Sequence, residues 1–352
     1  MPDEEPISKP KRKFALKIIT RGACIRLAIA AAVLAALYLW AYATMIKMPG
    51  QSYSGPLPPL TDEQLALRAE LRRHIDALAT DIGEKNIWNY HNLAAAADYI
   101  ESALTDANCS PHRQNYQAEG KTCSNLEAQI TGQAFPDQIV VIGSHYDSVY
   151  GSPGANDNCS AVAANLALAR RLANTKPART LRFVFFANEE FPFFQTDQMG
   201  SRVYAKSCRE KNENIVAMLS LETIGYYTDS PNTQKYPFPF SIFYPSKGNF
   251  LGFVSNTRSK DLLHSAITSF RKHCKFPSQG GAIPEFVPGI DWSDHDSFWH
   301  YNYPAIMLTD TAPFRYPYYH SPEDTFNKIC FDHLARVTSA LQSVIYDLAT
   351  SN

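Results

Sequence analysis

The chain has 352 residues, of which 45% are hydrophobic, and its 33 basic and 34 acidic residues leave a formal net charge of −1. Because nucleic acid binding needs a strongly basic surface, this balance gives no support to a nucleic acid partner, and we expect none. The length and the apolar fraction are sufficient for one large α/β domain with a substantial hydrophobic core.

The first element expected along the chain is a membrane-spanning helix. Residues 27–46 contain no charged side chain, and a helix of this length, at 1.5 Å per residue, would cross a bilayer. The preceding residues 1–26 are rich in Lys and Arg, whereas only Lys47 follows the apolar run before Pro49. Because basic residues stay on the cytoplasmic side, we expect a cytoplasmic segment 1–26, a signal anchor 27–46, and a periplasmic or extracellular domain.

A cleavable signal peptide is the alternative interpretation of this segment. Ala41 and Ala43 form an A-x-A pattern after the apolar run, which is typical of a cleavage site and would give a secreted protein. The length of the run favours a retained anchor instead. So do three bulky aromatic residues near its end that suit a membrane interface: Tyr38, Trp40 and Tyr42.

A linker and the helices of the following domain are expected next. Residues 47–60 are rich in Pro, Gly and Ser and predict a linker, which leaves residues 61–352 as a single domain. Apolar residues recur every three to four positions over 61–82 and over 89–107, so we expect two amphipathic helices there, the first opened by a capping box. The same pattern over 332–349 predicts a long helix at the end of the domain.

The chain has seven cysteines, and a location outside the cytoplasm would permit disulfide bonds between them. Cys109 and Cys123 bracket two segments that predict a hairpin or strand pair, 111–117 and 124–131. We therefore expect a Cys109–Cys123 disulfide. The spacing of the cysteines is not that of a Cys-ligated zinc site.

Ionisable residues follow two predicted strands at the point where each strand ends. Residues 138–144 and 180–187 are short apolar runs that predict strands covered on both faces. They are followed by His145 and Asp147 in the first case, and by Glu189 and Glu190 in the second. A buried carboxylate needs a cation, and imidazole mixed with carboxylates is a typical ligand set of Zn²⁺. Asp147 could also accept the second ring N–H of His145 and fix its tautomer.

Asp157 precedes a predicted helix over 157–173 and follows a short Gly-rich loop that begins at Gly151. A helix N-cap is the simpler interpretation of such an Asp. The loop is short, however, and would bring Asp157 back over the end of the strand that leads to His145. There its two carboxylate oxygens could bridge two metal ions.

Two further candidates are weaker when taken alone. Glu222 ends a third predicted strand, 216–222, and His320 lies in an aromatic, Pro-flanked loop before the last helix. A Glu at a strand end is usually solvated, and a single His in a loop is usually structural. The alternation of strands with helices predicts an α/β fold, a three-layer α/β/α sandwich around a mainly parallel central sheet.

Six short motifs then occur in one order along the chain: HYDS, GANDN, ANEE, LETIGYY, SDHDSFW and YYHSPEDT. In this order they resemble the co-catalytic zinc exopeptidases, the superfamily of bacterial leucyl aminopeptidases, glutamate carboxypeptidase II and glutaminyl cyclases. The resemblance covers most of residues 90–350, so residues 61–352 are expected to form a zinc exopeptidase catalytic domain.

The resemblance implies two Zn²⁺ ions per chain. It implies metal ligands at five positions: His145, Asp157, Glu190, Glu222 and His320. Asp157 would bridge the two ions, with His145 and Glu222 completing one site and Glu190 and His320 the other. The sequence departs from the family at Glu222, where many members have the shorter Asp.

The resemblance also makes Glu189 the general base. Adjacent side chains diverge, so Glu189 would not ligate the same ion as Glu190 and is free to carry the proton of an attacking water. We count Asp147 with Glu189 as a catalytic residue. Three tyrosines are candidate donors to an oxyanion: Tyr303, Tyr318 and Tyr319.

The expected activity is that of a membrane-anchored zinc aminopeptidase, which hydrolyses the N-terminal residue from a peptide with a free N-terminus. Aromatic residues follow two ligand motifs, and they predict either ordinary core packing or a pocket for an apolar first residue: Phe191, Phe193, Phe194, Tyr226 and Tyr227. The alternatives are a glutaminyl-cyclase-like acyltransferase with one zinc ion, and a binding protein that has the peptidase fold without its metals.

Overall fold

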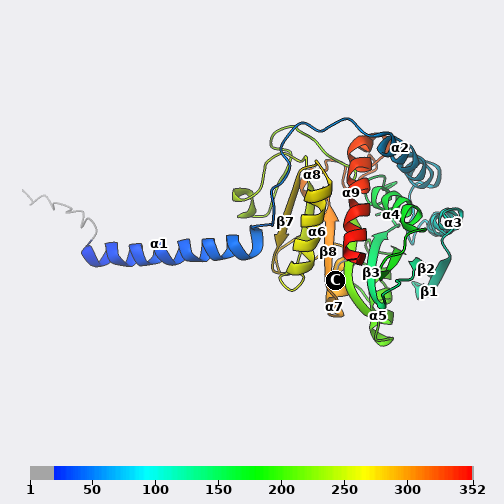
Figure 1. The fold of residues 1–352 in the computed structure, drawn as a ribbon, viewed down its shortest axis with the longest axis horizontal. Helices are drawn as coiled ribbons and strands as arrows, with labels where there is room; N and C mark the ends of the chain where they lie inside the picture. Colours follow the sequence, from blue (N-terminus) through cyan, green and yellow to red (C-terminus); the bar gives the residue numbers. More distant parts are fainter. Residues whose placement is uncertain (1–19, 351–352) are drawn as a thin grey trace, which may run out of the picture. The chain divides into compact units, whose positions relative to one another are not determined.

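The computed structural model describes residues 20–350, which divide into two compact units at Thr44 and Met45 (Figure 1). The first unit contains helix α1 (Arg21–Ala41), none of whose residues is buried, and the helix continues as a π-helical turn over Tyr42–Ile46. By length and composition, the helix over Arg21–Ile46 could cross a membrane. Most of the expected basic segment 1–26 lies outside the described residues.

The second unit is built around one eight-stranded sheet. Its strands are β1 (Pro111–Ala118), β2 (Lys121–Ile130), β3 (Phe135–His145), β4 (Arg179–Phe186), β5 (Asn214–Glu222), β6 (Leu251–Ser255), β7 (Ser278–Ala282) and β8 (Ala305–Thr309). Across the sheet the order is β1-β2-β4-β3-β5-β8-β6-β7. The four central strands β4, β3, β5 and β8 run parallel, so their carboxyl ends lie at one edge of the sheet.

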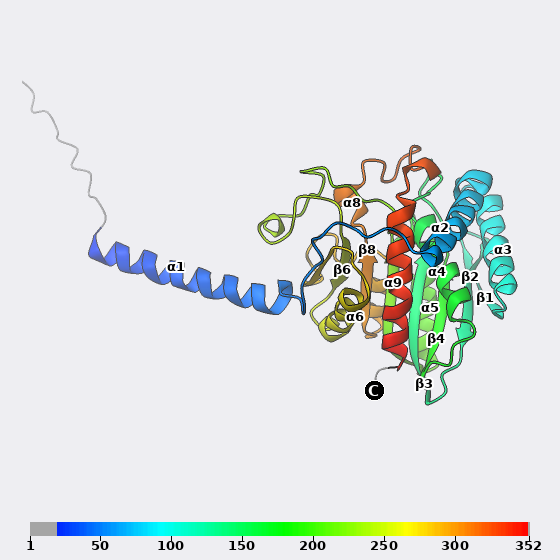
Figure 2. The ribbon, with the colours of Figure 1, turned by 45° about the horizontal axis from the view of Figure 1, so that its top comes forward.

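Helices cover both faces of this sheet. They are α2 (Asp62–Ile75), α3 (Tyr90–Asp106), α4 (Cys159–Leu172), α5 (Gly200–Glu210), α6 (Lys260–His273), α7 (His295–His300), α8 (Ala312–Arg315) and α9 (Phe331–Thr350). Figures 1 and 2 show α9 across one face, between α6 and α4. Helices α5 and α7 pack on the opposite face.

The domain has a hydrophobic core on each face of the sheet, and this explains why the sequence of β3 is a continuous apolar run. Val140 and Ile142 belong to the core beneath α4 and α9, whereas Ile139 and Val141 belong to the core beneath α5 and α7. A strand covered on both faces has no solvent side on which to place polar residues. The predicted three-layer sandwich is confirmed, with four parallel and three antiparallel neighbours in its sheet.

The expected Cys109–Cys123 disulfide is wrong, since all seven cysteines are free. The predicted hairpin exists, but Cys123 lies near its turn and pairs with Tyr116, whereas Cys109 precedes the far end of β1. Cys109 lies seven positions before Tyr116, and at about 3.3 Å per position an extended chain covers roughly 23 Å over this stretch. A disulfide needs Cα atoms within about 7 Å of each other.

The expected linker 47–60 runs along the second unit and is bonded to it; we call residues 48–58 the strap. Arg271 Nη1 donates to the Pro49 carbonyl oxygen at 2.7 Å, and the Ser278 N–H donates to Ser52 Oγ at 2.9 Å. Farther on, Arg336 Nη2 donates to the Pro58 carbonyl oxygen at 2.7 Å. The chain therefore enters the domain at α6 and β7 before it reaches α2.

The buried His74 on α2 makes stability depend on pH. Its Nδ1 lies 2.8 Å from the hydroxyl of Tyr99, and burial, helped by Arg73, lowers the pKa of His74 to about 4. Between about pH 6.5 and pH 4 the unfolded chain therefore takes up a proton that the folded domain does not bind. The free energy of unfolding should fall over this window, on the order of 1–3 kcal/mol from this residue.

Urea unfolding of metal-free protein at about pH 7 and at about pH 4.5 measures this effect. His74→Gln should show a smaller loss of stability between the two pH values than the wild type. His91→Gln, at an exposed position on α3, is the matched control and should match the wild type. The same pH dependence in His74→Gln and the wild type would contradict the assignment.

Candidate metal centre

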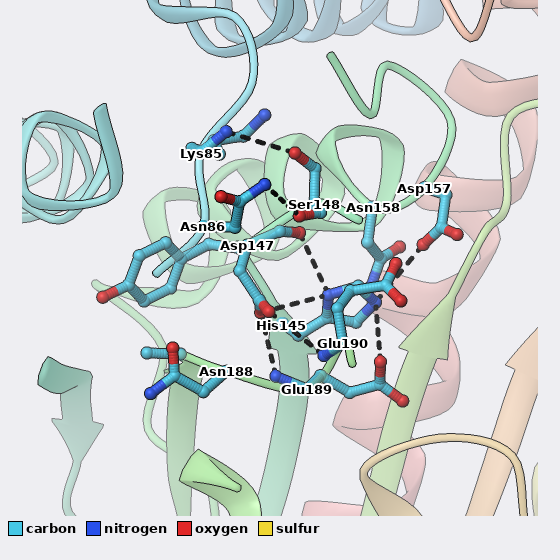
Figure 3. A network of polar contacts seen from close by, with 12 residues as sticks. Lys85, Asn86, His145, Asp147, Ser148, Asp157, Asn158, Asn188, Glu189 and Glu190 are labelled. Atoms are coloured by element: carbon cyan, nitrogen blue, oxygen red, sulfur yellow. Dashed lines mark hydrogen bonds and ion pairs between the residues drawn. The ribbon is translucent and has the colours of Figure 1, made fainter. Parts of the chain in front are cut away.

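The predicted metal ligands converge at the carboxyl ends of the parallel strands. Figure 3 shows part of this cluster, with His145, Asp157 and Glu190 close together. His145 is the last residue of β3, and Glu222 is the last residue of β5. Glu190 follows β4, and Asp157 lies in the loop that precedes α4. His320 comes from the loop after α8, and its side chain is 36% exposed, whereas the other four are buried.

Asp157 lies between the two imidazoles. Its Oδ1 is 3.4 Å from His145 Nε2, and its Oδ2 is 3.1 Å from His320 Nε2. Glu222 Oε2 lies 3.4 Å from His145 Nε2, and Glu190 Oε1 lies 3.3 Å from His320 Nε2. The ligand atoms therefore form two triplets that share Asp157, each with all its atoms within 4.8 Å of one another.

The donor set of these triplets fits zinc. Asp157 Oδ1 and Glu190 Oε1 are buried and have no hydrogen-bond partner among the described residues, and such oxygens are costly unless a cation pairs with them. Carboxylates and imidazoles are ligands that Zn²⁺ takes in proteins. Two triplets with a shared carboxylate can hold two ions.

Burial, with the charge of Asp157 as a smaller contribution, raises the pKa values of two carboxylates in this cluster. Burial raises the pKa of Glu190 to about 7, and burial also raises the pKa of Glu222. Burial acts in the same direction on Asp157, but the neighbouring imidazoles of His145 and His320 hold the pKa of Asp157 below its ordinary value. The carboxylates outnumber the imidazoles, so the cluster has an excess of negative charge that divalent cations would neutralise.

Asp147 has a role that sequence reasoning missed. Its two carboxylate oxygens accept hydrogen bonds from the backbone N–H groups of Glu189 and Glu190, at 3.0 and 3.1 Å. His145 Nδ1 lies 3.2 Å from the Asp147 carbonyl oxygen and 3.5 Å from its Oδ1. Asp147 therefore lies beside the outer ring nitrogen of His145 with both its carbonyl and its carboxylate oxygen, and its carboxylate also fixes the turn that carries the two glutamates.

Glu189 faces the centre without belonging to either triplet. Its Oε2 is 4.0 Å from His145 Nε2. Burial raises the pKa of Glu189 well above its ordinary value; the imidazole of His145 opposes this, and the charges of Glu190 and Glu222 add to it. A carboxylate that is near the ligands but not among them is free to exchange a proton.

Asp324 was not expected in the site. Its carboxylate accepts the backbone N–H groups of Asn156 and Asp157, at 2.8 and 3.0 Å, and the hydroxyl of Tyr316 at 2.7 Å. It lies four residues after His320, so one loop supplies a ligand and also holds the backbone of Asp157. The only signal in the sequence is the position of Asp324 in the YYHSPEDT motif.

The structure separates the three candidate tyrosines. Tyr303 donates to the Glu213 carbonyl oxygen and packs in the core under α7, away from the centre. The ring of Tyr318 lies under Lys328 Nζ, at 4.2 Å. Tyr319 stacks on His320, with ring centroids 3.8 Å apart, and burial and the nearby carboxylates raise its pKa, so its hydroxyl keeps its proton.

An apolar pocket of about 120 Å³ lies beside the centre, bounded by Glu222 and Tyr319. Its other aromatic lining residues are Tyr236, Phe240, Tyr244, Phe250, Phe253, Trp292 and Phe314. None of the aromatic residues that follow the ligand motifs lines this pocket. Phe193 and Tyr227 are core residues, which agrees with the simpler interpretation, and Phe191 is exposed.

Comparison with known proteins gives consistent matches. Residues 125–345 match peptidase family M28. The Escherichia coli (strain K12) protein YfbL is 32% identical over 287 residues, which are 79% of this chain and 87% of YfbL. Leupeptin-inactivating enzyme 1 of Streptomyces exfoliatus is 29% identical over 234 residues, which are 63% of this chain and 50% of that enzyme.

Two solved structures share the fold. The zinc aminopeptidase BSAP from Bacillus subtilis has a TM-score of 0.66 at 14% identity, covering 81% of this chain and 95% of BSAP. The glutaminyl cyclase from Bacteroides thetaiotaomicron has a TM-score of 0.61 at 16% identity, covering 83% of this chain and 99% of the cyclase. At these identities the likeness concerns the fold.

Asp324→Asn is expected to weaken zinc binding in both halves of the centre. One carboxylate oxygen becomes an amide NH₂, which cannot accept a backbone N–H, so the Asp157 loop loses a charge-assisted hydrogen bond worth about 1.5–3 kcal/mol. Zinc affinity, measured by competition with a chromogenic chelator, should fall about 10- to 100-fold, as is usual for partners that orient metal ligands.

Tyr316→Phe is the matched control, because it removes one hydrogen bond to Asp324 and leaves both backbone contacts in place. It should retain nearly the zinc affinity of the wild type. Wild-type affinity in Asp324→Asn would show that Asp157 is held in place without this carboxylate.

Proposed function

The chain belongs to peptidase family M28, and from this premise we propose that it is a membrane-anchored aminopeptidase that removes the N-terminal residue of peptides with two zinc ions. The resemblance to the zinc exopeptidases is confirmed by the family match, and so is the classification as a metallopeptidase. The observation that carries the proposal is the position of Asp157, whose two oxygens face two different triplets of ligand atoms.

The proposed mechanism assigns the proton to Glu189. Zinc held by the five ligands would supply Lewis acidity, acidifying a water molecule and polarising the scissile carbonyl. Glu189, next to the ligands and held by the contact of Asp147 with its N–H, takes the proton of that water. The same carboxyl group then delivers the proton to the scissile nitrogen. The nitrogen therefore leaves as a neutral amine and not as an amide anion.

Tyr319 is the proposed donor to the oxyanion. It stacks on His320 and borders the pocket beside Glu222, so its hydroxyl is on the side of the centre where the substrate carbonyl would lie. A protonated phenol can donate a hydrogen bond to a developing negative charge, and such donors contribute strongly in sites that exclude water.

The proposed substrate is a peptide with a free N-terminus and an apolar first residue. Its ammonium group would pair with the carboxylates of Glu190 and Glu222. Its side chain would fill the apolar pocket, whose volume of about 120 Å³ is close to that of engineered cavities that admit benzene. Leu and Phe are therefore the preferred first residues.

The membrane-anchored part of the proposal rests on the apolar N-terminal helix. The helix over Arg21–Ile46 has the length and composition of a membrane span. With the basic residues of segment 1–26 in the cytoplasm, residues 47–352 would act on the periplasmic or extracellular side.

Glu189→Gln is expected to keep its zinc and lose most of its turnover. The amide has nearly the same shape as the carboxylate but cannot accept the proton of the water, so kcat on Leu-anilide should fall on the order of 10²- to 10⁴-fold. Metal analysis of the same sample is the internal control. Glu210→Gln, at an exposed position on α5, is the matched variant that should retain full activity. Near-normal kcat in Glu189→Gln would remove this residue from the mechanism.

Asp157→Ala and His145→Ala should differ in zinc content. Asp157 faces both triplets, so its loss should lower occupancy in both, whereas the loss of His145 should empty only one. Zinc per chain, measured by atomic emission after dialysis against dilute zinc, is expected to fall further in Asp157→Ala. Equal zinc content in Asp157→Ala and the wild type would contradict a bridging role.

Acetylated Leu-anilide should be hydrolysed far more slowly than Leu-anilide. Blocking the amine removes a charge-assisted contact worth about 1.5–3 kcal/mol and leaves a buried carboxylate without its partner. Chelators should abolish hydrolysis, and added zinc should restore it. A zinc-loaded sample that cleaves neither anilide, but converts N-terminal Gln peptides to the pyroglutamyl form with release of ammonia, would establish the glutaminyl cyclase alternative.

A further inference from the structure

One surface loop of the domain is unusually apolar. Residues 236–245, which we call the 236–245 loop, have the sequence YPFPFSIFYP and contain no charged side chain. The side chains at its tip are not covered by the domain, since Phe238 is 90% exposed and Ile242 is 65% exposed. Exposed apolar patches of this kind are typical of surfaces that bind another protein or a membrane.

The base of the loop is fixed to the edge of the sheet. The rings of Tyr236 and Tyr244 stack with centroids 5.5 Å apart, and Tyr236 Oη donates to the Pro245 carbonyl oxygen at 2.7 Å. Tyr244 Oη donates to the carbonyl oxygen of Gly280, in the edge strand β7, at 2.9 Å. The loop is therefore held at its base and presents Phe238 and Ile242 outward.

The strap begins at the same residue of β7. The side chain of Met48 packs against Gly280 so closely that a Cβ at that glycine would lie 2.9 Å from its Sδ. Gly280 thus contacts Tyr244 of the loop through its carbonyl oxygen and Met48 of the strap at its Cα. No side chain at position 280 separates the strap from the strand that anchors the loop.

Chain length then limits how far the loop can be from the membrane. The candidate span ends at Ile46, and the two residues from there to Met48 reach at most about 7 Å. A helix that spans the bilayer therefore brings Met48, Gly280 and the base of the 236–245 loop to the lipid surface. The chain length limits the distance of Met48 from the membrane, and the contacts of Gly280 with Met48 and Tyr244 extend this limit to the base of the loop.

We propose that the 236–245 loop inserts Phe238 and Ile242 into the interfacial region of the bilayer, on the side where the catalytic domain lies. The inference rests on the membrane anchor of the proposed function. Aromatic and apolar side chains favour this region, and the exposed Lys235 and Lys247 on either side of the loop suit anionic lipid headgroups.

The insertion would bring the substrate pocket to the lipid surface. Tyr236, Phe240 and Tyr244 of the same loop line the pocket, whereas Phe238 and Ile242 do not. The pocket would therefore receive the apolar first residue of peptides that are themselves held at the membrane. This narrows the proposed substrate class to membrane-associated peptides with a free N-terminus.

Photo-crosslinking of the full chain tests the insertion. A p-benzoylphenylalanine is placed at position 238, at position 242, or at the control position 150, where Tyr150 is 70% exposed in the loop after β3. Each protein is reconstituted in vesicles of phosphatidylethanolamine and phosphatidylglycerol and irradiated. Mass spectrometry should find phospholipid adducts at positions 238 and 242 and none at position 150.

Each of the following outcomes would overturn the proposed insertion. Protein that resists alkaline extraction but gives no lipid adduct at either loop position excludes it, and an adduct between two chains makes the loop an interface between copies. Release by alkali, or a mature chain that begins at Thr44, removes the anchor and the inference with it. Hydrolysis of soluble Leu-anilide is scored separately, so failure of the anchor is distinguishable from failure of the aminopeptidase proposal.

A double variant, Phe238→Ser with Ile242→Ser, tests the consequence for the substrate. It should lose several-fold in kcat/KM on a Leu-peptide tethered to a lipid and keep the wild-type value on soluble Leu-anilide, which also shows that it is folded. An equal loss on both substrates, or no loss on either, would overturn the proposal.

Discussion

The excess of carboxylates at one edge of the sheet is the constraint on which the rest of the site depends. Parallel strands bring their carboxyl ends together, and here each central strand contributes or leads to an acidic group in a region closed to solvent. Without a cation these groups repel one another, and the buried oxygens Asp157 Oδ1 and Glu190 Oε1 lie 3.4 and 3.3 Å from imidazole nitrogens without forming a hydrogen bond. The geometry is that of a cluster built for ions.

Two further carboxylates hold this cluster in place by accepting hydrogen bonds from the backbone of the ligand loops. Asp147 uses both oxygens to hold the turn of Glu189 and Glu190, and Asp324 uses both to hold the loop of Asp157. Each is a carboxylate that binds backbone N–H groups, so each aims a ligand loop without competing for metal. The acidic residues of the site therefore include some that belong to the two triplets and others that hold the backbone of the ligand loops.

Sequence reasoning predicted what local patterns encode. The apolar runs that became β3 and β4 and the capping box at Thr61 came from short stretches, whereas the full set of ligand-type residues that meet at the centre came from the resemblance of six motifs to the zinc exopeptidases. Contacts across many residues were not predictable in this way. The hold of Asp324 on Asp157 spans 167 positions, and the error about Cys109 and Cys123 arose because the register of the hairpin is not visible in their spacing. The short strands β6 and β7, which contain glycines, were also missed, and with them the wall of the pocket.

The loop that carries both His320 and Asp324 makes the two halves of the proposed metal centre depend on one structural element. Asp324 lies 167 positions from Asp157 along the chain, so a fold in which this loop is not docked has neither the second imidazole nor the support for the shared carboxylate. Docking of this one loop therefore completes one triplet and at the same time fixes the carboxylate that both triplets share, so the two halves of the proposed centre assemble together rather than one after the other.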